Sequence, residues 1–156
     1  MDLTFKTENG RFNYRVGAII IHDNKILMVK NELSPYFYSV GGRVKLNETA
    51  EQAVLREVYE ETGIHMEVDR LGFVHECFFV EEVTKERFHE LSFYFYIKAK
   101  DIENIRSNSY TELGAKEGLF WLPLDRLNEF YIYPEFFREK LLSPITELQH
   151  ILTVRE

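Results

Sequence analysis

Apolar positions in the first forty residues follow the pattern of strands joined by tight turns. Two runs of β-branched and aliphatic residues, 16–21 and 25–29, flank the pair Asp23-Asn24 and predict a hairpin. A third apolar run, Phe37 to Val40, leads into Gly41-Gly42. This run predicts a short strand that ends in a glycine-marked loop.

From Thr49 onward the apolar spacing changes to that of a helix. Ala50, Ala53, Val54 and Val58 recur at helical intervals. Thr49 and Gln52, three residues apart, have the pattern of a capping box, and Gly63 is a natural C-terminal stop. The sequence therefore predicts one helix between Thr49 and Gly63, of about three and a half turns.

The second half of the chain predicts further strands and two weaker helices. The predicted elements are two long strands at 65–83 and 87–99, a polar and aperiodic segment at 101–118, a short strand at 119–122, and helices at 124–130 and 134–142. The tail beyond Ser143 has no clear pattern. This order predicts an α/β (α+β) protein with a mixed β-sheet flanked by helices, and one domain over residues 1–156.

Charge and cysteine content narrow the class of protein. The 156 residues carry 19 Lys and Arg against 26 Asp and Glu, a net charge of −7, which argues against binding to a nucleic-acid backbone or an anionic membrane. Cys77 is the only cysteine, so no disulfide can form within the chain, as is typical of a reducing compartment. Neither a targeting segment nor a membrane span is predicted, and we expect a cytoplasmic protein.

Three carboxylates lie near the end of the predicted helix. Glu57, Glu60 and Glu61 are spaced i, i+3 and i+4 and share one helix face. One interpretation is a solvated acidic face. However, the negative end of the helix dipole and mutual repulsion both disfavour this cluster, and a divalent cation would relieve the repulsion. Carboxylate oxygens suit Mg²⁺, so the cluster favours an open magnesium site.

Zinc does not suit this chain, because it has no Cys-x-x-Cys pair. His65, His75 and His89 are scattered along predicted strands without ligand spacing and are interpreted as structural.

Two further features adjoin the acidic cluster. Arg56 is expected to form a bidentate pair with Glu48 on the incoming loop, which would fix the loop to the helix. The alternative is an ordinary i, i+4 contact between Arg56 and Glu60. At Gly41-Gly42 the backbone can approach a ligand closely and present a carbonyl to a metal or amides to a phosphate, although the pair by itself is only a turn signal.

Together these residues resemble the Nudix box of the MutT-like Nudix hydrolases. The 23-residue stretch GRVKLNETAEQAVLREVYEETGI, from Gly42 to Ile64, matches the box at every specified position. The resemblance implies an αβα sandwich that uses Mg²⁺ or Mn²⁺ to hydrolyse a nucleoside diphosphate linked to another moiety. It also implies Glu57 and Glu61 as the principal metal ligands, Glu60 as a further ligand or base, and the Gly41 carbonyl as another ligand.

The same resemblance assigns Arg56 and Glu48 as a supporting pair and suggests one more glutamate from outside the box. Glu117 and Glu90 are the candidates, with Glu117 ahead of Glu90 and a solvated or structural carboxylate as the alternative for each. The implied partner is a small nucleotide. The sequence leaves the oligomeric state open, and a homodimer is one of the possibilities.

Which pyrophosphate is cut is not indicated by the sequence. In relatives that prefer ADP-ribose this neighbourhood tends to carry a proline, and in diadenosine polyphosphate hydrolases a tyrosine. This chain has Cys77-Phe78-Phe79-Val80 there, so neither signature is present. The rings that could stack on a base are Tyr36, Phe37, Tyr38, Phe78 and Phe79, with burial in the core as the alternative for each. We expect selectivity from segments 31–38 and 101–118, tested by replacing Ser107 to Glu112 with a Gly/Ser linker. The competing function is a catalytically inactive Nudix-fold module that binds or senses a nucleotide.

Overall fold

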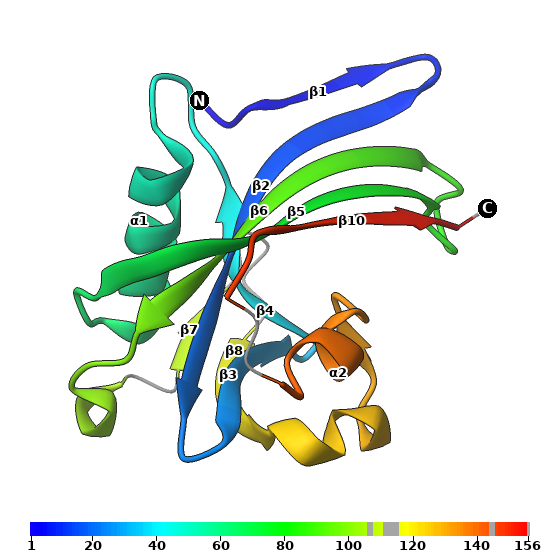
Figure 1. Cartoon of the computed structure of the whole chain (residues 1–156). Helices are drawn as coiled ribbons and strands as arrows, with labels where there is room; N and C mark the ends of the chain where they lie inside the picture. The colour runs from blue at the N-terminus through cyan, green and yellow to red at the C-terminus, as the bar shows by residue number, and fades with distance from the viewer. Residues whose placement is uncertain (106–107, 111–115, 144–145, 156) are drawn as a thin grey trace.

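The computed structural model describes the chain apart from residues 106–107, 111–115, 144–145 and 156 (Figure 1). Its strands are β1 Thr4–Thr7, β2 Gly10–His22, β3 Lys25–Asn31, β4 Phe37–Arg43, β5 Glu67–Val80, β6 Arg87–Lys98, β7 Asn108–Tyr110, β8 Lys116–Pro123, β9 Ile132–Tyr133 and β10 Gln149–Val154. Its helices are α1 Ala50–Thr62, the 3-10 helices η1 Ile102–Asn104 and η2 Leu124–Glu129, and the single turn α2 Phe137–Lys140.

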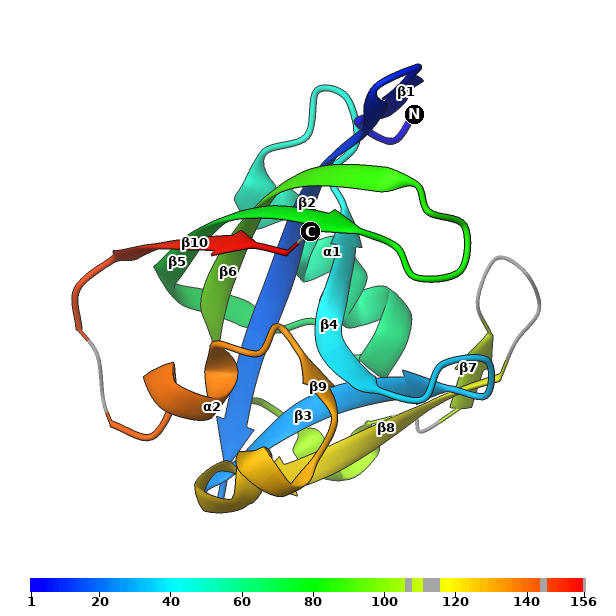
Figure 2. The ribbon, with the colours of Figure 1, turned by 90° about the vertical axis from the view of Figure 1, so that its right-hand side faces the viewer.

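The strands form one mixed sheet in the order β10-β5-β6-β2-β4-β3-β8-β7, with β1 beside β2 and β9 beside β4. Three pairs, β10 with β5, β2 with β6 and β4 with β9, are parallel, and the others are antiparallel. Helix α1 covers one face, while η2 and α2 cover the other (Figures 1 and 2). The predicted mixed sheet between helical layers is confirmed.

A separate apolar core lies on each face of the sheet. The core under α1 includes Val54 and Val58 of the helix together with Phe95 and Ile97 of β6. The core on the opposite face contains Phe73, Tyr94, Leu127 and Phe137 among others. Strand β6 therefore contributes to both cores through alternate residues, as a strand covered on both faces does.

Helix α1 begins and ends as the sequence predicts. The backbone N–H of Gln52 donates to the Thr49 hydroxyl (3.0 Å), and the Gln52 side chain accepts from the Thr49 N–H (2.9 Å). Gly63 ends the helix in the left-handed conformation at φ 80°. Ala53, Val54 and Val58 are fully buried. The last turn of the helix, which carries Glu60 and Glu61, contains no basic residue.

The sequence prediction was wrong about Gly41-Gly42. The two glycines are not in a loop but inside β4, where Gly42 pairs with Val16 and Gly41 with Gly17. Gly41 has φ +155°, and a side chain there would overlap the carbonyl oxygen of Val16. Glycine is needed because two strand backbones and a helix end meet closely at this point.

Several elements in the second half also differ from the prediction. The 101–118 segment includes η1, β7 and the start of β8, and the two predicted helices shrink to η2 and the four residues of α2. Strands β1, β9 and β10 were not predicted. Within the described residues, no helix is long and apolar enough to cross a membrane.

Candidate functional site

Two carboxylates of α1 lie directly against the glycine pair of β4. Oε2 of Glu61 accepts a hydrogen bond from the backbone N–H of Gly41 (3.0 Å). The Glu57 carboxylate occupies the space where Gly42 would carry a side chain, since a Cβ there would lie 2.6 Å from its Cδ. Glu57 is 15% exposed, whereas Glu60 is 50% exposed. The helix end thus presents Glu57 and Glu61 to the sheet and Glu60 to solvent.

Arg56 holds the loop before α1 and the acidic residues together. Its Nε and Nη2 donate to the two carboxylate oxygens of Glu48 (2.7 and 2.9 Å), which is the predicted bidentate contact. Nη2 also donates to the Arg43 carbonyl (3.0 Å), and Nη1 to Glu57 (2.9 Å). The alternative contact with Glu60 is present as well, but longer (3.4 Å).

The Arg56 contact also determines the charge of Glu48. Hydrogen bonding from Arg56 lowers the pKa of Glu48, and the N–H of Lys45 (2.9 Å) adds to the effect. The loop before α1 is therefore fixed by a carboxylate that stays ionised.

Burial and neighbouring charges raise the pKa of both inward-facing carboxylates. Burial is the main cause for Glu61, and the negative charges of Glu57 and Glu117 add to it, so that its pKa is well above the usual range. Burial also raises the pKa of Glu57, against the opposing effect of Arg56. Burial and like charge thus disfavour the ionised forms of Glu57 and Glu61 more than the adjacent arginines favour them.

Glu117 of β8, the candidate from outside the box, lies in this cluster. Its carboxylate accepts a hydrogen bond from the hydroxyl of Tyr38, which in turn accepts one from the Asn31 amide (3.2 Å). Burial and the contact with Glu117 raise the pKa of Tyr38. The charge of Glu117 therefore acts on the pKa of Glu61, and a hydrogen bond from Tyr38 holds Glu117 to β4.

Glu90, the other candidate, has different neighbours. It accepts a hydrogen bond from the amide of Asn13 on β2 (2.8 Å) and acts electrostatically on Cys77 and Tyr94. Of the two glutamates, only Glu117 is placed by these contacts beside the helix end.

Sequence reasoning missed Arg15 of β2. The positive charge of Arg15 acts to lower the pKa of both Glu57 and Glu61. In the sheet, Arg15 is the register partner of Arg43 on β4. The signal was present, because Arg15 is the charged residue that precedes the apolar run of β2.

The three histidines have structural surroundings, as expected. His75 is buried, contacts the Thr153 hydroxyl (2.9 Å) and has its pKa lowered by burial to about 4. His65 stacks on Tyr59, and His89 stacks on Phe78.

The residues at the helix end suit a hard divalent cation. Glu57, Glu61 and Glu117 offer oxygen donors only, in a region where their own charges repel one another. Among the described residues, no group of three or more His, Cys, Asp or Glu side chains is already arranged around a metal position. Arg56 and the Gly41 N–H instead occupy oxygens of Glu57 and Glu61. The donor chemistry fits Mg²⁺ or Mn²⁺.

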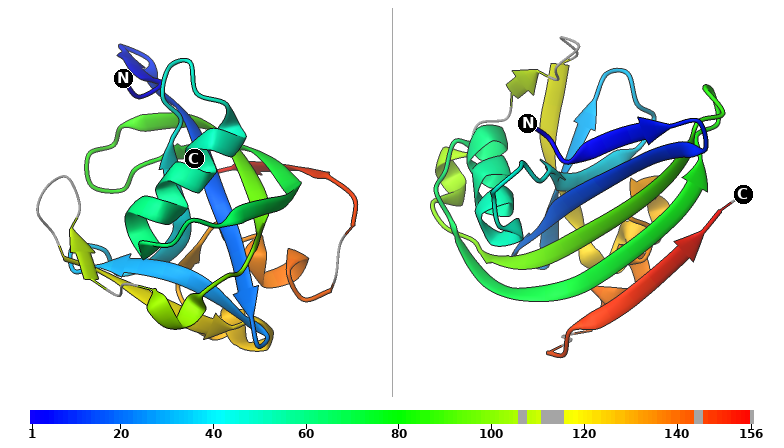
Figure 3. Two further views of the ribbon diagram at one scale, coloured as in Figure 1. Left: turned by 90° about the vertical axis from the view of Figure 1, so that its left-hand side faces the viewer. Right: turned by 90° about the horizontal axis from the view of Figure 1, so that it is seen from above.

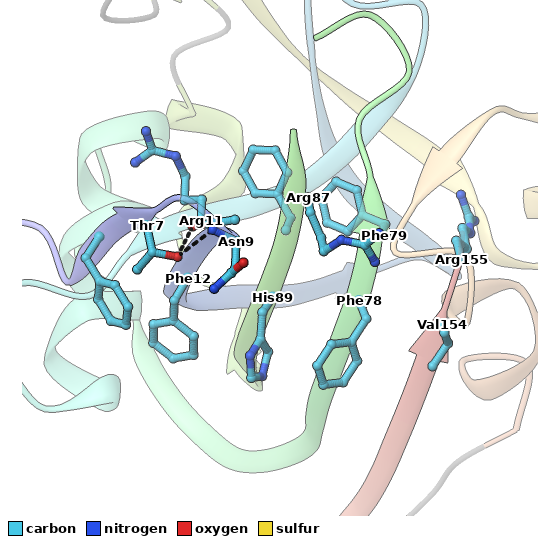
Figure 4. A pocket seen from close by; sticks show the side chains of 13 residues that line it. Thr7, Asn9, Arg11, Phe12, Phe78, Phe79, Arg87, His89, Val154 and Arg155 are labelled. Carbon is cyan, nitrogen blue, oxygen red and sulfur yellow. Dashed lines mark hydrogen bonds between the residues drawn. The ribbon is translucent and has the colours of Figure 1, made fainter. Parts of the chain in front are cut away.

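A hollow of about 650 Å³ lies away from this cluster. It lies at the end of the sheet that α1 does not cover, where five strands run side by side: β1, β2, β6, β5 and β10 (Figure 3). The hollow is lined by a row of side chains, one from each strand: Phe5, Phe12, His89, Phe78 and Val154 (Figure 4). No residue of the 42–64 segment lines it among those described.

The five rings considered for base stacking have separate surroundings. Phe37 packs against Phe120 and Phe130, while Phe79 stacks on Phe88. Phe78 lies in the row just described, and the Tyr38 hydroxyl is bound to Glu117. Tyr36 has ring contacts with three tyrosines, Tyr38, Tyr131 and Tyr133. Of the second segment expected to give selectivity, residues 106–107 and 111–115 lie outside the described residues, and with them three of the six positions of the Ser107–Glu112 replacement.

Comparison with known proteins agrees with this architecture. A 59-residue stretch is 46% identical to the ADP-ribose pyrophosphatase of Methanocaldococcus jannaschii and covers 36% of this chain and about a third (35%) of that protein. The mutator MutT protein from Bacillus halodurans superimposes with a TM-score of 0.61 at 17% identity, covering 88% of this chain and 89% of that chain. An ADP-ribose pyrophosphatase from Streptococcus suis gives 0.58 at 18% identity, with 88% and 98% covered. The NUDIX domain matches residues 11–141, and the chain therefore belongs to the NUDIX family.

Proposed function

We propose that this protein hydrolyses the pyrophosphate bond of a nucleoside diphosphate linked to another moiety, with Mg²⁺ or Mn²⁺ as the cofactor. The observation that carries the proposal is the meeting of Glu57 and Glu61, at the end of α1, with the glycine pair of β4, where the charges of Glu57 and Glu117 add to burial in raising the pKa of Glu61. Clustered buried carboxylates cost folding energy, which a bound cation and its phosphate ligand would offset. Two similar proteins, named ADP-ribose pyrophosphatase and putative 8-oxo-dGTP diphosphatase, support the same reaction class.

In this proposal, Glu57 and Glu61 hold the cation, with the Gly41 carbonyl and Glu60 as further oxygen donors. When bound, the cation neutralises charge on the phosphates and activates water. Glu117 would serve as a general base or as a further oxygen donor, and the Tyr38 hydroxyl, which donates to its carboxylate, would orient it. Arg56 and Glu48 are positioning residues that fix the loop and the Glu57 side chain.

Replacing Arg56 with Lys tests this positioning role. An ammonium group cannot contact both Glu48 oxygens, the Arg43 carbonyl and Glu57 at once, so we expect kcat to fall by about 10- to 100-fold with a small change in KM. Steady-state kinetics at saturating metal measures both constants. Arg126→Lys, which alters an exposed arginine paired only with Glu129 on η2, is the matched control. If the two variants had equal rates, the Arg56 contacts would be merely structural.

The reaction itself is tested by a panel of nucleoside triphosphates, nucleotide sugars and dinucleotides, with Mg²⁺, with Mn²⁺ and with a chelator. We expect release of a nucleoside monophosphate or inorganic pyrophosphate from at least one compound, lost with the chelator and restored by either metal. Binding of nucleotides without any turnover would favour the inactive module instead.

A further inference from the structure

Strand β10 lies at an outer edge of the sheet and lacks the features that protect such edges. It pairs with β5 on one side, and among the described residues no strand lies on its other side (Figure 3). Its residues, QHILTV, include no Lys, Arg, Asp, Glu or Pro, and its ladder with β5 contains no bulge. By contrast, the edge strand β1 carries Lys6, and the edge strand β7 has only three residues. A regular edge without charged residues or proline is prone to pair with another chain.

The backbone groups on the outer side of β10 belong to every second residue. The N–H of Arg155 donates to the carbonyl of Phe78 on β5 (2.7 Å). The N–H and C=O of one strand residue point to one side, and those of the next residue point to the other. The odd-numbered residues of β10 therefore bond to β5, and His150, Leu152 and Val154 direct their backbone groups outward. A strand added to this edge would bond through these three residues.

The even-numbered positions also carry exposed apolar side chains. Leu148, directly before β10, is 55% exposed, Leu152 is 60% exposed and Val154 is 59% exposed. The three share one face of the sheet, because alternate residues of a strand do so, and Val154 is aligned with Phe78. On this face Val154 is the last side chain of the row that lines the hollow. Apolar side chains gathered on an unprotected edge favour contact with another protein.

The sequence around β10 is complementary to itself in the antiparallel direction. The acidic Glu147 lies shortly before the strand, and the basic Arg155 directly follows it. If two copies are aligned antiparallel about Ile151, Leu148 of each copy lies opposite Val154 of the other, and Glu147 lies opposite Arg155. In the same alignment the outward-facing residues lie directly opposite one another, as hydrogen-bonded pairs of an antiparallel ladder require. One register thus matches backbone groups, apolar side chains and charges.

We propose that β10 pairs antiparallel with β10 of a second copy of this chain, which forms a two-fold symmetric dimer with one sheet running through both copies. Such an interface uses the same surface on each copy and closes after two, so β10 is no longer an edge. Arg155 also contacts Glu135 within its own chain, and a guanidinium with five donors can serve a second carboxylate. The dimer continues the apolar row of the hollow into the second copy, where Leu148 lies beside Val154.

Sedimentation equilibrium of the whole chain tests the dimer. At micromolar concentration the wild type should have twice the monomer mass of 18.6 kDa. Leu152→Pro removes an outward N–H without removing a bond to β5, and Leu152→Lys adds a charge to the edge. Each should raise the dimer Kd by about 100-fold or more. Leu33→Lys, in the connection between β3 and β4, is the matched control, because Leu33 is 68% exposed and the dimer should persist.

Amide hydrogen exchange, followed residue by residue by NMR, gives a second readout. In the dimer the N–H groups of His150, Leu152 and Val154 should be protected like those of Ile151 and Thr153, whereas in a monomer only the latter two should be. Leu152→Lys should restore this alternation, and the protected odd-numbered amides would show that the variant is folded. A monomeric wild type with fast exchange at the outward amides overturns the proposal. A dimer that persists in both Leu152 variants also overturns it, because its interface would lie elsewhere. Neither measurement depends on the proposed hydrolysis.

Discussion

Glu57→Gln is expected to lower kcat/KM by about 10³-fold or more while the protein stays folded. The substitution keeps the shape of the side chain but removes the charge that lies against Gly42 and is contacted by Arg56. Without that charge the proposed site loses one of its two principal cation donors, and the phosphates lose the stabilisation of developing charge. Initial rates across a metal titration measure the loss, and excess metal should restore the wild-type rate only in part.

Stability gives the second readout of the same variant. Burial raises the pKa of Glu57, so its ionised form is disfavoured in the apo protein, and the neutral amide should keep or slightly raise the melting temperature. Glu51→Gln in the first turn of α1 is the matched control, because Glu51 is exposed and distant from the helix end. Near wild-type rates in Glu57→Gln, or equal losses in both variants, would show that the site has been assigned wrongly.

The parts of this structure that the sequence predicts are those determined by neighbours along the chain. Helix α1 depends on Thr49, Gln52 and Gly63, which lie at its two ends, and its boundaries were predicted to the residue. The contact of Arg56 with Glu48 spans eight residues and was also predicted. In each case the physical determinant lies within one or two helical turns of the residue concerned.

The parts that were missed depend on pairing between distant segments. Strand β10 is ordered by parallel pairing with β5, more than seventy residues earlier, and its six residues are only half-buried or exposed. Strand β9 has only two residues, aligned by β4. Arg15 became part of the site only because β2 crosses the sheet beside β4. A single sequence contains no signal for such pairings when local propensity is weak.

Gly41-Gly42 combines both cases, since the pair was recognised but its structural setting was not. The two glycines predicted that the backbone approaches another group closely. In the structure that group is the Val16 backbone at Gly41 and the Glu57 carboxylate at Gly42. The two glycines therefore serve different purposes, one in the packing of strands and one in the placement of a carboxylate.

Alanine substitutions at these two positions should separate stability from activity. At Gly41 a Cβ would overlap the Val16 carbonyl and lie 2.9 Å from the Cα of Gly17, at a φ of +155° that side chains rarely adopt. Backbone atoms of a central strand cannot move aside cheaply, so Gly41→Ala should cost about 3 kcal/mol of unfolding free energy. We expect its melting temperature to fall by about 6 to 12 °C in a thermal unfolding scan.

At Gly42 the added Cβ meets only the end of the Glu57 side chain, which can turn away. Gly42→Ala should therefore keep its stability within about 1 kcal/mol but lower kcat/KM by about 100-fold, because a displaced catalytic group loses its alignment. Since both changes act through one carboxylate, Gly42→Ala should add little to Glu57→Gln in the double variant. Full additivity of the two losses, or a Gly42→Ala variant as active as wild type, would mean that Gly42 does not position Glu57.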